Sequence, residues 1–137
     1  MDDVSEGSRF ARMVPLVFAV ACIMWLLASP ALAQPSPTAQ AEIDHLLDFV
    51  ATSSCTFVRN GDGHPAAEAR EHLQGKLRFA GSRISTADEF IKYIATGSSV
   101  SGDAYHVRCG TTDMLAGVWL ADELKRYRAV AQAPRRP

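Results

Sequence analysis

Three side chains of the kinds that bind metal ions or transfer protons follow one another at intervals of four residues: His64, Glu68 and His72. Residues four apart lie on one face of an α-helix, so on a continuous helix these three could converge on one ion. Pro65 places His64 outside the regular helix, and the spacing differs from the His-Glu-x-x-His pattern of zinc proteases. The opposing interpretation is a helix start at which Glu68 faces the positive end of the helix dipole. A metal-dependent, hydrolase-like enzyme is therefore kept as the alternative hypothesis.

A second candidate cluster centres on two arginines, Arg59 and Arg108, in short segments that are predicted to pair as strands. Once paired, their guanidinium groups could stand on one face and bind a carboxylate or a phosphate through paired hydrogen bonds. The opposing interpretation is two structural arginines in ion pairs with nearby carboxylates. The candidate ligand-binding set consists of Arg59, Asn60, His64, Tyr105 and Arg108.

Three serines, Ser98, Ser99 and Ser101, lie next to Gly102 in a predicted loop. A serine nucleophile needs a general base and an oxyanion hole, and the sequence assigns neither. Serines beside glycine usually form turns, which is the favoured interpretation here. We assign no catalytic residue and no cofactor.

The elements that must position these residues are four helices and two strand-like segments. Apolar residues at helical spacing and a capping box that starts at Thr86 predict the helices, and β-prone composition next to turn residues predicts the strands. The helices are expected over 42–51, 66–79, 87–95 and 118–127, and the paired strands over 55–59 and 105–109, with a turn over 60–63. The predicted fold is mainly α (α+β), a small single domain of about four helices with a short two-stranded β element.

The two cysteines outside the N-terminal region, Cys55 and Cys109, are expected to form a disulfide. An even pair of cysteines in a small exported domain is most simply explained in this way. The bond would close a long loop and contribute roughly 4 kcal/mol to stability. A pair of metal or redox thiols is the alternative, but no Cys-x-x-Cys motif supports it.

The first 33 residues have the organisation of a secretory signal peptide. Two arginines precede an apolar run over 13–28, and small residues follow, so we expect cleavage between Ala33 and Gln34. The run is shorter than the ~20 residues of a spanning helix, which disfavours an uncleaved anchor. We expect an exported protein, periplasmic or secreted, with no membrane span after signal cleavage.

Residues 34–137 suffice for one domain with a single core. Basic and acidic residues are equal in number in this part of the chain, and no basic block occurs. Nucleic-acid binding needs clustered Lys and Arg, so that class of function is excluded. The expected division of the chain is a signal peptide over 1–33, a linker over 34–40, a folded domain over 41–128 and a disordered tail over 129–137.

Short motifs spread along the folded part resemble one protein family. They include the run CTFVRNG from Cys55 to Gly61, then His64, His72-Leu73, Thr86-Ala87, Phe90-Ile91, Tyr105, Val107-Arg108-Cys109 and Trp119-Leu120. Together they resemble the DUF5329 family of exported bacterial proteins. The resemblance implies a bacterial exported domain and supplies no catalytic residue, because that family has no assigned activity. This chain has Asp103-Ala104 before Tyr105, where the family pattern has a proline, and the difference bears on the stiffness of the loop.

The favoured functional hypothesis is a small periplasmic or secreted binding module without catalysis, whose partner is a small anionic ligand or an envelope protein. The alternative enzyme would use His64, Glu68 and His72, together with Ser99 or Ser101. A structural envelope protein with no site is the third hypothesis. The short chain favours a protein that is not an enzyme, because a deep pocket needs more surrounding structure.

Overall fold

The computed structural model describes residues 34–133. The predicted signal peptide and its cleavage after Ala33 lie outside the described residues. In chain order the elements are α2 (Pro37–Thr52), β1 (Thr56–Arg59), β2 (Asp62–His64), α3 (Ala66–Ala80), the short 3-10 helix η2 (Gly81–Arg83), α4 (Ala87–Glu89), the π-helix η3 (Phe90–Ala95), β3 (His106–Cys109), β4 (Thr112–Leu115) and α5 (Ala116–Gln132).

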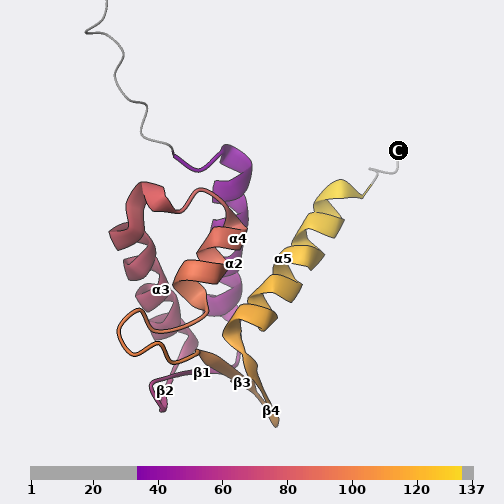
Figure 1. Ribbon diagram of the computed structural model, residues 1–137. Coiled ribbons are helices and arrows are strands. Elements are labelled where there is room, and N and C mark those ends of the chain that lie inside the picture. Colours follow the sequence, from indigo (N-terminus) through magenta and orange to yellow (C-terminus); the bar gives the residue numbers. More distant parts are fainter. Residues whose placement is uncertain (1–33, 134–137) are drawn as a thin grey trace, which may run out of the picture. The chain divides into compact units, whose positions relative to one another are not determined.

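The strands form one antiparallel sheet in the order β2-β1-β3-β4, and the helices lie against one side of it (Figure 1). This arrangement confirms the small α+β class and the pairing of the two predicted strands, β1 and β3. The prediction of only two strands was wrong, because β2 and β4 extend the sheet at its two edges. The core lies between sheet and helices, and its largest fully buried side chains are Phe90, Ile43, Leu46, Leu120, Val50 and Val107.

The chain repeats one unit, a β-hairpin followed by a helix. Thr56 begins β1 and His106 begins β3, while Ala66 begins α3 and Ala116 begins α5, so each element starts 50 residues after its counterpart. Each hairpin has a two-residue loop, formed by residues 60–61 and 110–111. In the first loop Asn60 and Gly61 both have positive φ, which two-residue hairpin turns commonly require. The two units meet through β1 and β3 at the centre of the sheet.

The β1–β3 register decides which side chains face the helices. Phe57 lies opposite Val107 at the centre of this pair, and both are buried. Side chains alternate along a strand, so residues two apart share a face. The core-facing row across the four strands consists of His64, Phe57, Val107 and Met114.

The predicted disulfide between Cys55 and Cys109 is present. Cys55 precedes β1 and Cys109 ends β3, so the pairing of the strands brings their Cα atoms to 4.5 Å. Both cysteines share the core-facing side with Phe57 and Val107 and pack against the core. The bond therefore joins the two repeated units at one end of their shared strand pair.

Helices extend beyond two of the expected boundaries. The helix α2 begins at Pro37, within the predicted linker, because Ser36 caps it by accepting a hydrogen bond from the Ala39 amide. At the other end, α5 continues to Gln132, within the predicted tail. Arg128 holds this last part of α5 by donating to both carboxylate oxygens of Glu42, at 2.7 and 2.8 Å. Residues 134–137 lie outside the described part.

Helix α3 is tied to the end of η3 by one lysine. The Lys76 ammonium donates to the carbonyl oxygens of Ile94 and Gly97, both at 2.7 Å. The last carbonyls of a helix have no partner within it, and a cation there also opposes the negative end of the dipole. Lys76 thereby fixes the segment that leads into the loop before β3.

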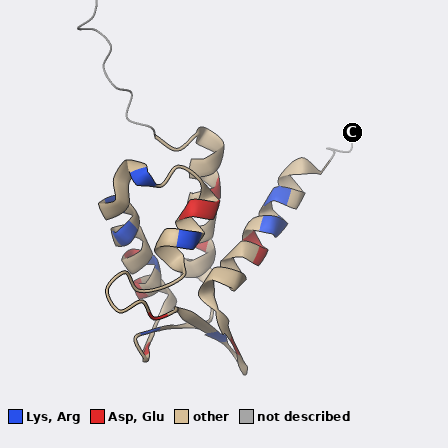
Figure 2. Cartoon of the chain, viewed as in Figure 1, with Lys and Arg blue, Asp and Glu red and all other residues tan. Residues whose placement is uncertain are grey.

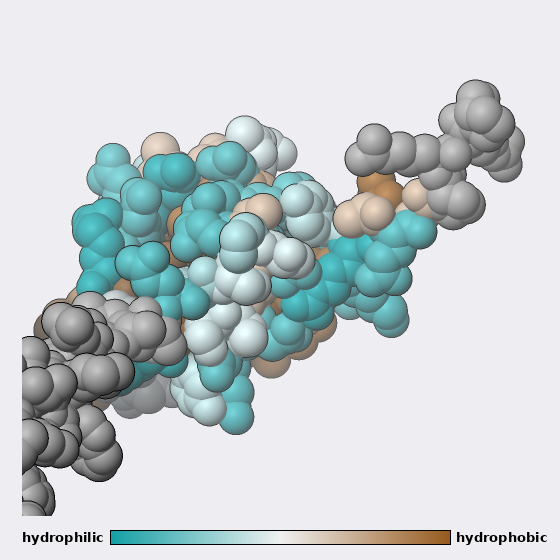
Figure 3. All heavy atoms as spheres, turned by 90° about the horizontal axis from the view of Figure 1, so that it is seen from above, coloured by the Kyte–Doolittle hydropathy of each residue, from teal (hydrophilic) through white to brown (hydrophobic). Residues whose placement is uncertain are grey.

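Charges of both signs are interspersed on the surface. Figure 2 shows basic and acidic residues following one another along α3 and α5. Seen from above in Figure 3, most of the visible described surface is hydrophilic, and apolar residues appear there in small areas. None of the described helices combines the length and the apolar character that a membrane crossing requires.

We predict that replacing both cysteines, Cys55→Ala with Cys109→Ala, lowers the free energy of unfolding by roughly 4 kcal/mol. The reason is that the unfolded chain regains the entropy that the closed loop removes. Urea denaturation of the double variant, and of the wild type with and without reductant, measures this. Equal midpoints for oxidised and reduced wild type would contradict the stabilising role of the bond.

We also predict that Lys76→Met lowers the free energy of unfolding by about 2 kcal/mol. The substitution leaves the carbonyls of Ile94 and Gly97 without their charged donor. The matched control is Lys92→Met, at an exposed lysine on η3, which should change stability by less than about 0.5 kcal/mol. Similar losses in the two variants would show that general charge, and not the carbonyl contacts, accounts for the effect.

Candidate functional site

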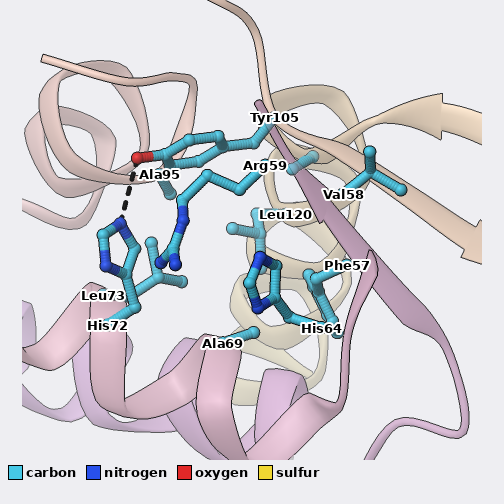
Figure 4. A pocket seen from close by; sticks show the side chains of 11 residues that line it. Phe57, Val58, Arg59, His64, Ala69, His72, Leu73, Ala95, Tyr105 and Leu120 are labelled. Carbon is cyan, nitrogen blue, oxygen red and sulfur yellow. Dashed lines mark hydrogen bonds between the residues drawn. The ribbon is translucent and has the colours of Figure 1, made fainter. Parts of the chain in front are cut away.

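A cavity lies between the core-facing side of the sheet and helix α3, close to the end of η3 and the start of α5. The space open to water-sized atoms is about 30 Å³, which holds about two water molecules. When the part of the cavity that is open to solvent is included, the unfilled space is about 400 Å³. Its lining comprises Phe57, Val58, Arg59, His64, Ala69, His72, Leu73, Ala95, Tyr105, Ala116 and Leu120 (Figure 4). Four polar side chains therefore share a mainly apolar cavity.

Arg59 supplies the permanent positive charge of this lining. It ends β1 two residues after Phe57, so its side chain faces the helices. In Figure 4 its guanidinium group reaches across the cavity toward His72 and lies above Leu73. Within residues 34–133 the Arg59 side chain has no ion-pair partner. The cavity thus contains a half-buried arginine that forms no ion pair with a described carboxylate.

Tyr105 joins the sheet to α3 through a short chain of hydrogen bonds. Its hydroxyl lies 3.0 Å from His72 Nε2, and Lys76 Nζ donates to the same oxygen at 3.4 Å. Lys76 also lies over the tyrosine ring, 4.9 Å from its centre. The backbone holds Tyr105 from both sides, since its amide donates to the Thr96 carbonyl and its carbonyl accepts from the Ala116 amide. The phenol is therefore fixed in place.

The surroundings shift the pKa values of these groups in directions that favour their neutral forms. Burial, and then the positive charges of Arg59 and Lys76, lower the pKa of His72 below its usual 6.5. Burial likewise raises the pKa of Tyr105 and lowers that of Lys76. At neutral pH the cavity therefore presents a neutral imidazole and a neutral phenol beside the Arg59 cation.

The three residues of the metal hypothesis do not form a ligand set. His64 Nδ1 lies 2.6 Å from Glu68 Oε1, whereas His72 contacts the Tyr105 hydroxyl. Among residues 34–133, no three His, Cys, Asp or Glu side chains come together in a way that could hold a metal ion. The proposed serines do not line the cavity either. Instead, the Ser98 hydroxyl accepts hydrogen bonds from backbone amides of its own loop, and Ser101 donates to Asn60.

The predicted ligand set is divided between the two faces of the sheet. Arg59, His64 and Tyr105 come together at the cavity. Arg108 pairs with the position of Thr56 and so points to the opposite face, where it donates to Asp113 at 2.8 Å. The expectation that the two guanidinium groups share one face was therefore wrong. Asn60 lies with Arg108 along a shallow depression of the outer face.

Two residues of the polar network were absent from the predicted ligand set, His72 and Lys76. The sequence motifs suggest a role for His72 only as a metal ligand. The available signal was their spacing of four on the predicted helix, which places both on one side of α3. Whether that side of α3 faces Tyr105 depends on how the helix packs against the sheet. The helical pattern alone therefore does not reveal the contact between His72 and Tyr105.

The repeat relates the candidate site to the disulfide. The shift of 50 residues places Tyr105 at the position equivalent to Cys55, and Cys109 at the position equivalent to Arg59. The disulfide thus occupies one end of the β1–β3 pair, and Arg59 with Tyr105 occupies the corresponding positions at the other end. The two halves share the same order of strands and helix. They differ in the side chains at these positions, which form a disulfide at one end and line the cavity at the other.

The chain is similar in sequence to known proteins. A curated protein of Salmonella typhimurium (strain LT2), named Uncharacterized protein YfeK, is 41% identical over 86 residues, which cover 62% of this chain and 72% of that protein. No solved structure matches this chain. The sequence profile of DUF5329, described as a family of unknown function, matches residues 37–128, which include every residue that lines the cavity. The chain therefore belongs to the DUF5329 family.

Proposed function

We propose that the protein is an exported binding module that holds the anionic group of a small ligand, or of an envelope partner, in the cavity between β1 and α3. The observation that carries this proposal is the half-buried Arg59 side chain, which lines the cavity and forms no ion pair with a described carboxylate. A guanidinium is always charged and presents paired donors that fit an oxyanion. A partly desolvated cation of this kind is a favourable place for an anion to bind.

A neighbouring side chain can provide a further donor for the same anion. The imidazole rings of His64 and His72 flank the Arg59 guanidinium in Figure 4, and each ring has two nitrogens. One His64 nitrogen contacts Glu68, and one His72 nitrogen contacts Tyr105. The second His64 nitrogen, Nε2, is left for a ligand, whereas in Figure 4 the second His72 nitrogen lies on the side of its ring away from Arg59.

The composition of the lining favours binding over catalysis. Among the described residues that line the cavity there is no serine, cysteine or carboxylate, so the lining offers hydrogen-bond donors but not the usual nucleophiles. Export is supported by the sequence of residues 1–33, where an apolar run follows two arginines and ends before small residues. The disulfide is consistent with an oxidising compartment.

We predict that small anions such as acetate, sulfate or phosphate shift the backbone amide resonances of Tyr105 and Leu73 saturably. Arg59→Ala should weaken this binding by about tenfold or more, because a charge-assisted pair is lost. Its folding free energy should change by less than about 0.5 kcal/mol, since the wild-type side chain has no described ion pair to lose.

Arg108→Ala provides the matched comparison on the outer face of the same sheet. Its guanidinium already pairs with Asp113, so anion binding should remain at the wild-type level. Binding that depends on Arg108 and not on Arg59 would move the site to the outer face. The absence of any saturable shift with the whole anion panel would overturn the proposal.

Anion binding should also strengthen as the pH falls from 7.5 to 5.5. Five ionisable groups face or adjoin His72: Arg59, His64, Glu68, Lys76 and Tyr105. The pKa of His72 lies below 6.5 in the free protein, and an anion on Arg59 raises it by opposing the positive charge. Binding is therefore coupled to proton uptake, and the dissociation constant decreases below about pH 6.5.

In the protein without a bound anion, the lowered pKa of His72 makes the folded state less stable at low pH. The folded state holds the His72 proton more weakly than the unfolded state, so His72 reduces the stability of the free protein as the pH falls below 6.5. His72→Gln should remove most of the pH dependence of binding, whereas His106→Gln, on the outer face beside Asp113, should not. Identical pH profiles for wild type and His72→Gln would exclude His72 as the coupled group.

A further inference from the structure

We infer that the group held in the cavity is the carboxylate at the end of a short aliphatic chain, either a free fatty acid or the C-terminus of a peptide whose last residue is small and apolar. This inference rests on the proposed function and specifies its ligand. It follows from three properties of the same cavity: the room beside the donors, the charge of the lining, and the chemistry of the walls.

The available room fits a carboxylate better than a tetrahedral anion. The part of the cavity that admits water-sized atoms has a volume of about 30 Å³. This space accepts about two atoms of the size of a water oxygen, and a carboxylate has two oxygens. Phosphate and sulfate have four oxygens each and would have to displace side chains to reach the same depth.

The charge of the lining fits a single negative charge. Arg59 supplies one positive charge, and His64 is already paired with Glu68. Lys76 directs its ammonium hydrogens to Ile94, Gly97 and the Tyr105 oxygen, so its hydrogen-bond donors are already used. A planar guanidinium matches a planar carboxylate through two parallel hydrogen bonds. A phosphate dianion would retain an uncompensated charge in a partly desolvated place.

The walls fit an aliphatic chain. Seven of the lining residues are apolar: Phe57, Val58, Ala69, Leu73, Ala95, Ala116 and Leu120. The wider space of about 400 Å³ includes open solvent, so an aliphatic chain would lie along these walls toward the solvent side of the cavity. Burial of each methylene group strengthens binding by about fourfold, so affinity should rise with chain length until the chain leaves the walls.

The experiment is a titration of the purified full chain by NMR, with backbone amide shifts as the readout. The probes are acetate, propionate, butyrate and hexanoate, compared with phosphate and sulfate at equal ionic strength. A second arm compares the peptide Gly-Gly-Ala carrying a free C-terminus with the same peptide carrying a C-terminal amide. We expect shifts at Tyr105 and Leu73 with each carboxylate, and affinity that increases by about fourfold per added carbon from acetate to butyrate.

Three variants test the charge of the site separately from its apolar walls. Arg59→Ala should weaken carboxylate binding by about tenfold or more at every chain length. Leu73→Ala shortens a buried wall residue and should flatten the dependence on chain length while acetate still binds, provided that the amide spectrum shows a folded protein. Ala95→Leu provides a second test, because it fills the cavity without removing a core side chain, and it should weaken butyrate more than acetate.

The outcomes distinguish this inference from the proposed function. Phosphate or sulfate binding more tightly than butyrate, with dependence on Arg59, would overturn the carboxylate assignment and leave the anion site in place. The absence of amide shifts with every anion would overturn both the carboxylate assignment and the proposed anion site. Shifts with the free-acid peptide but not with the fatty acids identify a peptide C-terminus as the source of the carboxylate, and the reverse result identifies a free acid.

Discussion

Strands β1 and β3 pair in a single register, which sets the face of the sheet on which each of their side chains lies. A shift of one residue in a strand moves each of its side chains to the other face of the sheet. With Phe57 opposite Val107, the core receives both of these side chains, and the same alternation turns Arg59 toward the helices and Arg108 toward solvent. The register also brings Cys55 and Cys109 together. Core, cross-link and candidate site therefore follow from a single pairing.

Within that frame, Tyr105 connects the sheet to the helical layer. Its ring is buried, and its hydroxyl contacts His72 and Lys76 on α3. Lys76 in turn holds the end of η3, where a π-helical segment leaves carbonyls that α3 can reach. Polar groups below the surface are costly unless they are paired, and among the described residues no buried side-chain nitrogen or oxygen lacks a partner. The polar network is thus compatible with a stable core, and the Arg59 guanidinium is available beside it.

Much of the fold follows from the sequence because its signals are local. The stripe of apolar residues in α2, the capping box at Thr86 and the glycine that ends α3 each determine an element without reference to the rest of the chain. The edge strands β2 and β4 lack such signals. The first contains Asp62 and Gly63, which have low β-propensity, and both strands are only three or four residues long. They form because the hairpin loops bring them beside a central strand.

The site was predictable only in part, for a specific reason. Phe57 and Val58 are adjacent, and both are buried, so β1 shows no alternation from which its inner face could be deduced. Without that face, Arg59 and Arg108 look equivalent in the sequence. The contact between His72 and Tyr105 joins residues from distant parts of the chain, and no helical or strand period encodes it. The residue types were recognisable, but their grouping depends on tertiary structure.

The two ends of the central strand pair are held by bonds of very different strength. At one end the Cys55–Cys109 bond fixes the strands covalently. At the equivalent positions of the other end stand Arg59 and Tyr105, which rely on noncovalent contacts. Local opening of a folded protein begins where such contacts are fewest. The disulfide keeps its own end of the pair together, so we expect any separation of β1 from β3 to begin at the end beside the cavity.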